Sequence, residues 1–228
     1  MEAKKNFSVF RFIMSCPKYV WLNFIVLALV QILVFDGTRI PLAYMEIHNI
    51  ETAWDRMIPF VPQWVTIYFL SFAQWFFTGL LIGKESQKHS CFWATAYIVC
   101  DLIALVIFMT YPGTLERPEI TGNGFWDLWM RFLYKVDSAT NLCPSLHVLA
   151  SYFCWRGSLS CESVPKWFKH GSFVFLILVC LSILFVKQHV LIDIPTAIVV
   201  GELGIFLTRR FNLDRFMLKL DNKLLGGN

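Results

Sequence analysis

The chain has 228 residues, of which 57% are hydrophobic, 17% aromatic and only 16% charged, whereas about 25% of the residues in an average soluble domain are charged. This composition excludes a disordered chain and a disulfide-stapled secreted module, and it disfavours a soluble globule because so much apolar surface could not be covered. The formal net charge of +4 is small and scattered, which does not favour nucleic-acid binding, so length and composition together predict an integral membrane protein of one domain.

Six apolar stretches predict membrane-spanning helices, because a helix needs about 17–25 apolar residues to cross the hydrocarbon layer. The predicted spans cover residues 19–35, 64–82, 91–111, 144–159, 173–186 and 190–207. The fourth stretch is the weakest by hydropathy. The predicted fold is therefore all-α: a polytopic membrane protein with six transmembrane helices in one bundle, forming a single domain over 1–228 with its core at 58–208.

Lys and Arg residues are distributed unequally between the two sides that this topology defines. One side holds 14 of the 20, and the other holds Arg39, Arg56, Arg117, Arg131, Lys135 and Lys187. Because basic residues are enriched on the cytoplasmic side of membrane proteins, both short terminal tails are predicted to be cytoplasmic. The two longest polar connections, 36–63 and 112–143, are then extracytoplasmic, and such long connections often carry function.

Ionisable groups inside a membrane span are costly and are usually functional. Asp101 and Glu202 lie within predicted spans without an obvious partner in the sequence. Either could line a polar cavity or bond a neighbouring helix, and the structural interpretation is favoured for both. The seven cysteines form no CxxC pair, so they are interpreted as small apolar fillers rather than disulfide or metal ligands. Cys143 is the cysteine expected on the outer face.

Two further elements could carry chemistry. Pro144 and Ser145 suit the first turn of a helix, which would place His147 near a helix N-terminus, where partial positive charge favours an anion. His189 and Asp193 are four residues apart, so a helix would put them on one face, with the carboxylate fixing the tautomer of the imidazole. Each element alone also has an ordinary structural interpretation: a histidine bonded to a backbone carbonyl, or a structural His–Asp pair.

Arg117 precedes a rigid proline in the second long loop, and a guanidinium can bind two phosphate oxygens at once. The predicted topology places Arg117, Lys187, His147, His189 and Asp193 on the outer face together. This set of side chains fits a phosphoryl group. Two cations could bind its oxygens, two imidazoles could make and break bonds to phosphorus, and one carboxylate could orient an imidazole. A zinc site made by the two histidines and the aspartate is an alternative by ligand type, although the neighbouring cations would repel a metal.

These elements, in this order, resemble the signature of the type-2 phosphatidic acid phosphatase superfamily, which reads Lys-x6-Arg-Pro, Pro-Ser-x-His and Ser-Arg-x5-His-x3-Asp. The corresponding segments here are 110–118, 144–147 and 182–193. Thr110 stands in place of the family's lysine, and Ile183 stands in place of the arginine. The Ser-Leu-His and Lys-Gln-His forms are more similar to the branch that contains inositol phosphorylceramide synthases.

The resemblance implies a mechanism that uses no metal and no organic cofactor. His189 would be the nucleophile that forms a phosphohistidine, Asp193 would orient it, and His147 would be the general acid and then the general base. The phosphate-binding residues would be Arg117, Ser145 and Lys187.

The activity implied by the resemblance is that of an integral membrane enzyme that cleaves a lipid phosphate or pyrophosphate at the outer membrane face. A lipid phosphotransferase, which moves a phospho-headgroup to a lipid alcohol as phosphorylceramide and sphingomyelin synthases do, is the alternative among enzymes. A catalytically silent anionic-lipid binder or transporter is the alternative from another class. The expected partners are a phospholipid or lipid pyrophosphate substrate and the surrounding membrane lipids, and no nucleic acid.

Overall fold

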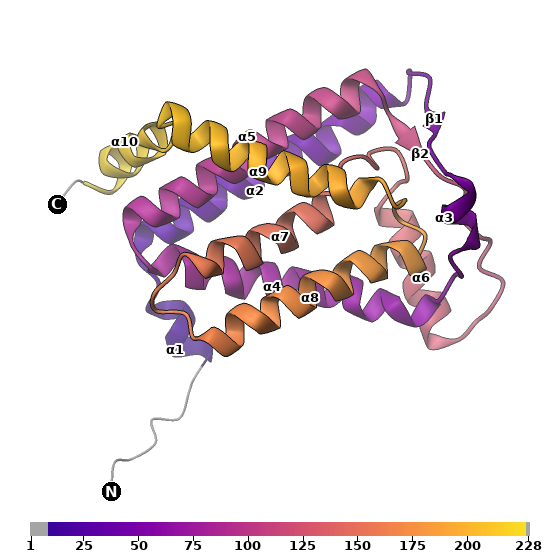
Figure 1. The fold of residues 1–228 in the computed structure, drawn as a ribbon, viewed down its shortest axis with the longest axis horizontal. Helices are drawn as coiled ribbons and strands as arrows, with labels where there is room; N and C mark the ends of the chain where they lie inside the picture. Colours follow the sequence, from indigo (N-terminus) through magenta and orange to yellow (C-terminus); the bar gives the residue numbers. More distant parts are fainter. Residues whose placement is uncertain (1–8, 227–228) are drawn as a thin grey trace, which may run out of the picture.

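The structure, a computed structural model, describes residues 9–226 and is mostly helical (Figure 1). Six long helices form one bundle and alternate in direction along the chain. They are α2 (Lys18–Leu42), α4 (Val65–Lys84), α5 (Gln87–Thr110), α7 (Leu146–Leu159), α8 (Lys166–Phe185) and α9 (Asp193–Phe211). Because an even number of helices alternates in direction, the first and last described residues lie at the same end of the bundle.

Shorter elements cover both ends of the bundle (Figure 1). α1 (Val9–Met14) and α10 (Asp214–Leu225) lie at the end where the chain starts and finishes, which we call the terminal end. The opposite end, the loop end, carries the elements of the two long connections: α3 (Ala53–Met57), the 3₁₀ turn η1 (Pro62–Trp64), α6 (Phe125–Val136) and the strands β1 (His48–Asn49) and β2 (Gly113–Thr114). The two strands pair in parallel, so they join the two long connections to each other.

Four helices of the described chain are long and apolar enough to cross a membrane: α2, η1 with α4 (Pro62–Lys84), α5 and α8. The prediction of a helical fold with apolar helices able to span a membrane is therefore confirmed for four helices. The predicted number of six spans is not confirmed. α7 has 14 residues, which is about 21 Å of helix against a hydrocarbon layer of about 30 Å. α9 has 19 residues but carries two acidic and two basic side chains, which lower its hydropathy.

The weak hydropathy of α7 follows from its place in the bundle, where it packs against α4, α8 and α9. Val148 and Leu149 belong to the main hydrophobic core, and buried Ser151 accepts a hydrogen bond from Trp75 Nε1 at 2.9 Å. A helix surrounded by other helices needs no broad lipid-facing surface, so it tolerates serines. On the other side of the core, a Cβ at Gly204 would lie 2.2 Å from Cys100 Sγ, so glycine permits the close packing of α9 on α5.

The first helix extends two turns beyond its predicted end at residue 35, to Leu42. Gly37 and Pro41 disfavour a helix in this segment, but contacts to the loop before α7 support it. Thr38 Oγ1 donates to Val34 O at 2.8 Å, and the amide of Asn141 donates to Phe35 O at 3.1 Å and to Thr38 Oγ1 at 2.7 Å. The two Asn141 contacts join residues more than 100 positions apart, which is why the local pattern predicts an earlier end.

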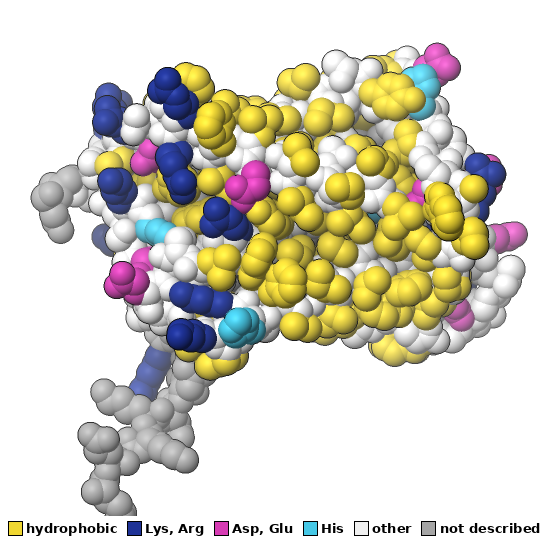
Figure 2. Space-filling view, in the orientation of Figure 1, with side chains coloured by type: hydrophobic (Ala, Val, Ile, Leu, Met, Phe, Trp, Pro, Cys, Tyr) yellow, Lys and Arg dark blue, Asp and Glu magenta, His cyan; other side chains and the backbone are white. Residues whose placement is uncertain are grey.

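The face of the bundle shown in Figure 2 is apolar between its two polar ends. Exposed fractions of 57–69% occur at Leu33, Val106, Val174, Val199 and Phe206, on four different helices. A soluble protein rarely exposes so much continuous apolar surface, so this surface is typical of a helical membrane protein.

Lys and Arg side chains gather at the terminal end (Figure 2). Twelve of the 14 basic residues assigned to that side lie in the described chain, and Lys4 and Lys5 lie outside the described residues. The helix directions therefore agree with the grouping of basic residues on which the predicted orientation depends.

Candidate active site

Three segments meet at the loop end of the bundle: the first turn of α7, the turn between α8 and α9, and the loop that follows β2. The backbone N–H of Ser145 donates to Asp193 O at 3.4 Å, which joins the start of α7 to the start of α9. Ser145, His147, His189 and Asp193 are buried with exposed fractions of 0%, 9%, 7% and 0%. The structure thus brings together four of the six residues that the sequence singled out.

His189 and Asp193 form a direct pair. His189 Nδ1 lies 2.9 Å from Asp193 Oδ2, and the same oxygen accepts the backbone N–H of Val190 at 3.0 Å. A carboxylate bonded to Nδ1 fixes the tautomer in which Nε2 carries a free lone pair. This is the arrangement that a nucleophilic imidazole requires.

The pair forms in a turn and not on one helical face, because α9 begins only at Asp193. α8 ends at Phe185, and Lys187 adopts the left-handed conformation with φ of 52°. The backbone N–H groups of Gln188 and His189 then both donate to Ile183 O, at 2.9 and 3.1 Å. The predicted start of the sixth helix at residue 190 was therefore three residues early, although the predicted pair is present.

His147 is the second residue of α7, next to the helix N-cap Ser145, whose hydroxyl accepts the N–H of Val148 at 3.4 Å. Its ring centroid lies 6.0 Å from that of His189, so one phosphoryl group could contact both imidazoles. Aromatic rings enclose the other sides of His147: Tyr68 at 4.3 Å and Trp75 at 5.2 Å between centroids. His147 Nε2 has no hydrogen-bond partner among the described residues, which leaves it available to a ligand.

Arg117 reaches the site through Gln188. Its guanidinium donates to Gln188 Oε1 and lies over the ring of Tyr134, 4.5 Å from the centroid. Gln188 lines the same narrow pocket as His147 and His189. Burial lowers the pKa of Arg117, and the nearby carboxylate of Asp137 opposes that shift.

Lys187 is directed away from the pocket. Its ammonium donates to Asp55 O at 2.8 Å, and Asp55 Oδ1 accepts the N–H of Leu191 at 2.7 Å. Burial lowers the pKa of Lys187, against the opposing charges of Glu51 and Asp55. The left-handed turn explains this direction, because it points residue 187 and residue 188 to different sides. Of the two cations predicted for the phosphoryl oxygens, the structure brings only Arg117 near the histidines.

The two positions that depart from the superfamily signature do not add charge to the pocket. Thr110 is exposed, and its hydroxyl donates to Val106 O at 2.8 Å within α5. Ile183 is fully buried in the main hydrophobic core.

Asp137 and Tyr68 are site residues that the sequence did not reveal. Tyr68 is 1% exposed, and its hydroxyl donates to Asp137 Oδ2. Asp137 lines the narrow pocket together with both histidines. Tyr68 lies among the apolar residues of α4 and Asp137 just after α6, so no spacing connects either to the motifs. Gln188 could have been noticed, since it directly precedes His189.

Several buried polar atoms of this site have no partner. Among the described residues, Arg117 Nε, His147 Nε2, Gln188 Nε2 and Asp193 Oδ1 are buried and lack a hydrogen-bond partner. Buried polar groups are normally paired, so each exception needs an explanation. His147 and Gln188 line the narrow pocket, so their free nitrogens are available to a polar ligand there.

The remaining predicted features fall outside this pocket. Glu202 accepts hydrogen bonds from Tyr152 Oη and, at 3.0 Å, from Arg156 Nε, so it bonds a neighbouring helix, as the structural interpretation expects. Asp101 is fully buried, with no partner for either carboxylate oxygen among the described residues. All seven cysteines are free. Within residues 9–226 no group of three His, Cys, Asp or Glu side chains is placed to hold a metal ion, which does not support the zinc alternative.

No family model matches the chain, and no curated protein or solved structure matches it. The geometry of the loop-end site is therefore the basis for a functional proposal.

Replacing Arg117 and replacing Lys187 are expected to change kcat/KM by different amounts. Arg117→Met should lower kcat/KM for a phospholipid substrate by about 10–100-fold, since a hydrogen bond to a charged group contributes about 1.5–3 kcal/mol. Lys187→Met keeps the aliphatic stem and should change kcat/KM by less than about threefold. Steady-state kinetics of the two purified variants test this difference. A larger loss for Lys187→Met than for Arg117→Met would return Lys187 to the phosphate site.

Proposed function

We propose that this protein is a membrane-embedded enzyme that breaks the phosphate ester or anhydride bond of a lipid through a phosphohistidine at His189. The observation that carries the proposal is the pairing of His189 Nδ1 with buried Asp193 at 2.9 Å, with His147 facing His189 across one pocket. The motif resemblance to the type-2 phosphatidic acid phosphatase superfamily supports the same chemistry.

In the first step, His189 Nε2 attacks phosphorus while the bond to the lipid oxygen breaks. His147 gives its proton to that leaving oxygen. In the second step, water or an alcohol gives a proton to His147 and attacks phosphorus, so the P–N bond breaks and His189 is free again. Asp193 holds His189 in place and offsets the positive charge that the imidazole gains.

The charge of the site favours transfer of a singly charged phosphodiester as a second candidate function. No Lys or Arg of the described chain lines the pocket itself: Arg117 is connected to it through Gln188 and Arg39 through Ser138, whereas Asp137 adds a carboxylate to its wall. A doubly charged phosphomonoester would need more positive charge than this. Attack by a lipid alcohol on the same phosphohistidine gives a lipid phosphotransferase, as in the branch that the Lys-Gln-His run resembles.

One assay separates these candidates from each other and from a silent binder or transporter. Purified protein in detergent with EDTA is given phosphatidic acid or a phosphodiester lipid, with and without diacylglycerol or ceramide as acceptor. Release of inorganic phosphate supports the hydrolase, and a new phospholipid formed only with the acceptor supports the transferase. No product from any lipid, with folded protein, would contradict the enzymatic proposal and favour the binder.

The proposal includes a topology in which all six long helices cross the membrane, with the loop end and its site outside the cytoplasm. The short α7 would cross within a ring of other helices. The basic residues at the terminal end support this orientation.

Cysteine labelling in intact cells tests the orientation. Native Cys161 is a poor reporter because it is 1% exposed and burial raises its pKa to about 12. Burial likewise raises the pKa of Cys143 to about 11. Trp54 at the loop end and Trp167 at the terminal end are 71% and 74% exposed, so each can be replaced by cysteine.

In a background with Cys143→Ser, a membrane-impermeant maleimide should label Trp54→Cys in intact cells. It should label Trp167→Cys only after the membrane is permeabilised. The reverse pattern would place the site on the cytoplasmic side.

A further inference from the structure

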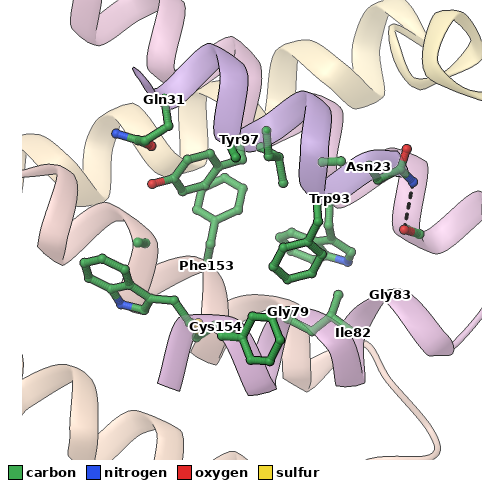
Figure 3. Close-up of a pocket in the computed structure, with 17 residues that line it drawn as sticks. Asn23, Gln31, Gly79, Ile82, Gly83, Trp93, Tyr97, Phe153 and Cys154 are labelled. Atoms are coloured by element: carbon green, nitrogen blue, oxygen red, sulfur yellow. Dashed lines mark hydrogen bonds between the residues drawn. The ribbon is translucent and has the colours of Figure 1, made fainter. Parts of the chain in front are cut away.

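Two largely apolar cavities, which together we call the groove, follow one another from His147 toward the terminal end of the bundle. The outer half of the groove is a cavity of about 360 Å³ whose lining includes His147, Asp137 and Asp36. Its inner half is a cavity of about 320 Å³ lined by α2, α4, α5 and α7 (Figure 3). Both volumes lie in the range of about 300–1,000 Å³ that is typical of ligand pockets.

The two cavities are adjacent, because Gln31, Trp75 and Tyr97 line both of them. Along α2 the combined lining runs from Asp36 to Asn23, which corresponds to about 20 Å of helix. A single lipid chain spans half of the bilayer's hydrocarbon core, or about 15 Å. The groove is therefore long enough to hold one lipid chain.

The chemistry of the lining changes along the groove. Carboxylates and an imidazole lie at the outer end, whereas no Asp, Glu, Lys, Arg or His among residues 9–226 lines the inner cavity. Its walls are mainly aromatic and aliphatic, with Trp93 and Phe153 among the side chains that point into it (Figure 3). At the far end, Asn23 Nδ2 donates to Ser90 Oγ at 2.8 Å. A polar entrance that includes an imidazole, an apolar body and a polar end match an amphiphile with one chain of limited length.

We infer that this groove holds one hydrocarbon chain of the lipid whose phospho-group lies at His189, an inference that rests on the proposed function. The chain enters sideways from the membrane, since Ala28 is exposed and also lines the inner cavity. The Asn23–Ser90 pair forms the end of the apolar groove and sets the longest chain that fits.

A photo-crosslinking experiment tests the inference without requiring turnover. The probe is an alkyl phosphate of about 16 carbons, a length suited to half of the roughly 30 Å hydrocarbon core, with a diazirine near its methyl end. The matching alkyl alcohol serves as the control probe. The His189→Ala protein in detergent is irradiated with each probe, and mass spectrometry locates the labelled peptides.

The phosphate probe should label residues of the inner cavity in α4 and α5, whereas the alcohol should label exposed positions over the whole apolar surface. Ala28→Phe adds a ring at the groove and should reduce the inner label at least about tenfold, since each buried methylene contributes about fourfold to binding. Leu29→Phe is the matched control: Leu29 is the adjacent residue, 57% exposed, and does not line either cavity. That variant should label as the parent protein does.

Equal inner labelling by both probes, or inner labelling that Ala28→Phe leaves unchanged, would overturn the inference. Failure of this inference can be distinguished from failure of the enzymatic proposal. Specific labelling of the inner cavity without turnover of any lipid would support a chain-binding groove and contradict the enzymatic proposal. Turnover with labelling scattered over the surface would support the enzyme and contradict the groove.

Discussion

Replacing His189 by alanine is expected to abolish turnover of every substrate, whatever its leaving group. The reason is that Nε2 of His189 is the proposed nucleophile, and its Nδ1 partner Asp193 cannot take over that role. Assays with a lipid phosphate and with an aryl phosphate should both fall to background. The purified variant should elute as the parent protein does, which shows that the loss is chemical.

His147→Ala is expected to separate the two substrates. General acid catalysis contributes about 10²–10⁴-fold, so lipid turnover should fall by that factor because an alkoxide is a poor leaving group. An aryl phosphate leaves as a stabilised phenolate and should still react once at each site. Equal losses on both substrates would show that the two histidines have been assigned the wrong roles, or that His147 only holds the start of α7.

Asp193→Asn is expected to reduce kcat by about 10³–10⁴-fold, comparable to the loss on removing the orienting aspartate of a His–Asp pair in a serine protease. Asp193 is 0% exposed and bonds both His189 Nδ1 and the N–H of Val190. An amide of the same shape can keep one of these contacts, but it loses the charge that offsets a protonated imidazole.

Glu202→Gln is the matched control for the loss of a carboxylate. Glu202 joins α9 to α7 through Tyr152 and Arg156, away from the pocket, so its neutralisation should leave kcat within about threefold. Thermal unfolding in detergent should show whether either variant is destabilised. If Asp193→Asn retained most of its activity, Asp193 would be a structural residue that fastens the turn before α9.

The pattern of apolar residues predicted all six long helices, because each apolar stretch is bounded by polar or charged residues. The first helix was predicted too short, since contacts of Asn141 to Phe35 and Thr38 extend it. The weak hydropathy of the fourth stretch corresponds to a short, enclosed helix. A local pattern cannot distinguish such a helix from one that contacts lipid along its length.

The candidate site was predictable where its residues are close in sequence or share a helix end. His189 and Asp193 meet as expected, although through a turn. The direction of Lys187 was not predictable, because it depends on a left-handed residue and on Asp55, which is 132 positions away. Tyr68 and Asp137 were missed because only the packing of α4 against the loop before α7 brings them to His147.

The most direct test of the central claim is to trap the phosphoenzyme. His147→Ala protein is mixed with an aryl phosphate and quenched with base, and the phosphorylated peptide is identified by mass spectrometry. The account predicts one phenolate released per protein and a base-stable, acid-labile phosphoryl group on His189, absent from the His147→Ala, His189→Ala double variant. Product formation by the parent protein, without any phosphoryl group on His189 in the trapped variant, would contradict the phosphohistidine mechanism.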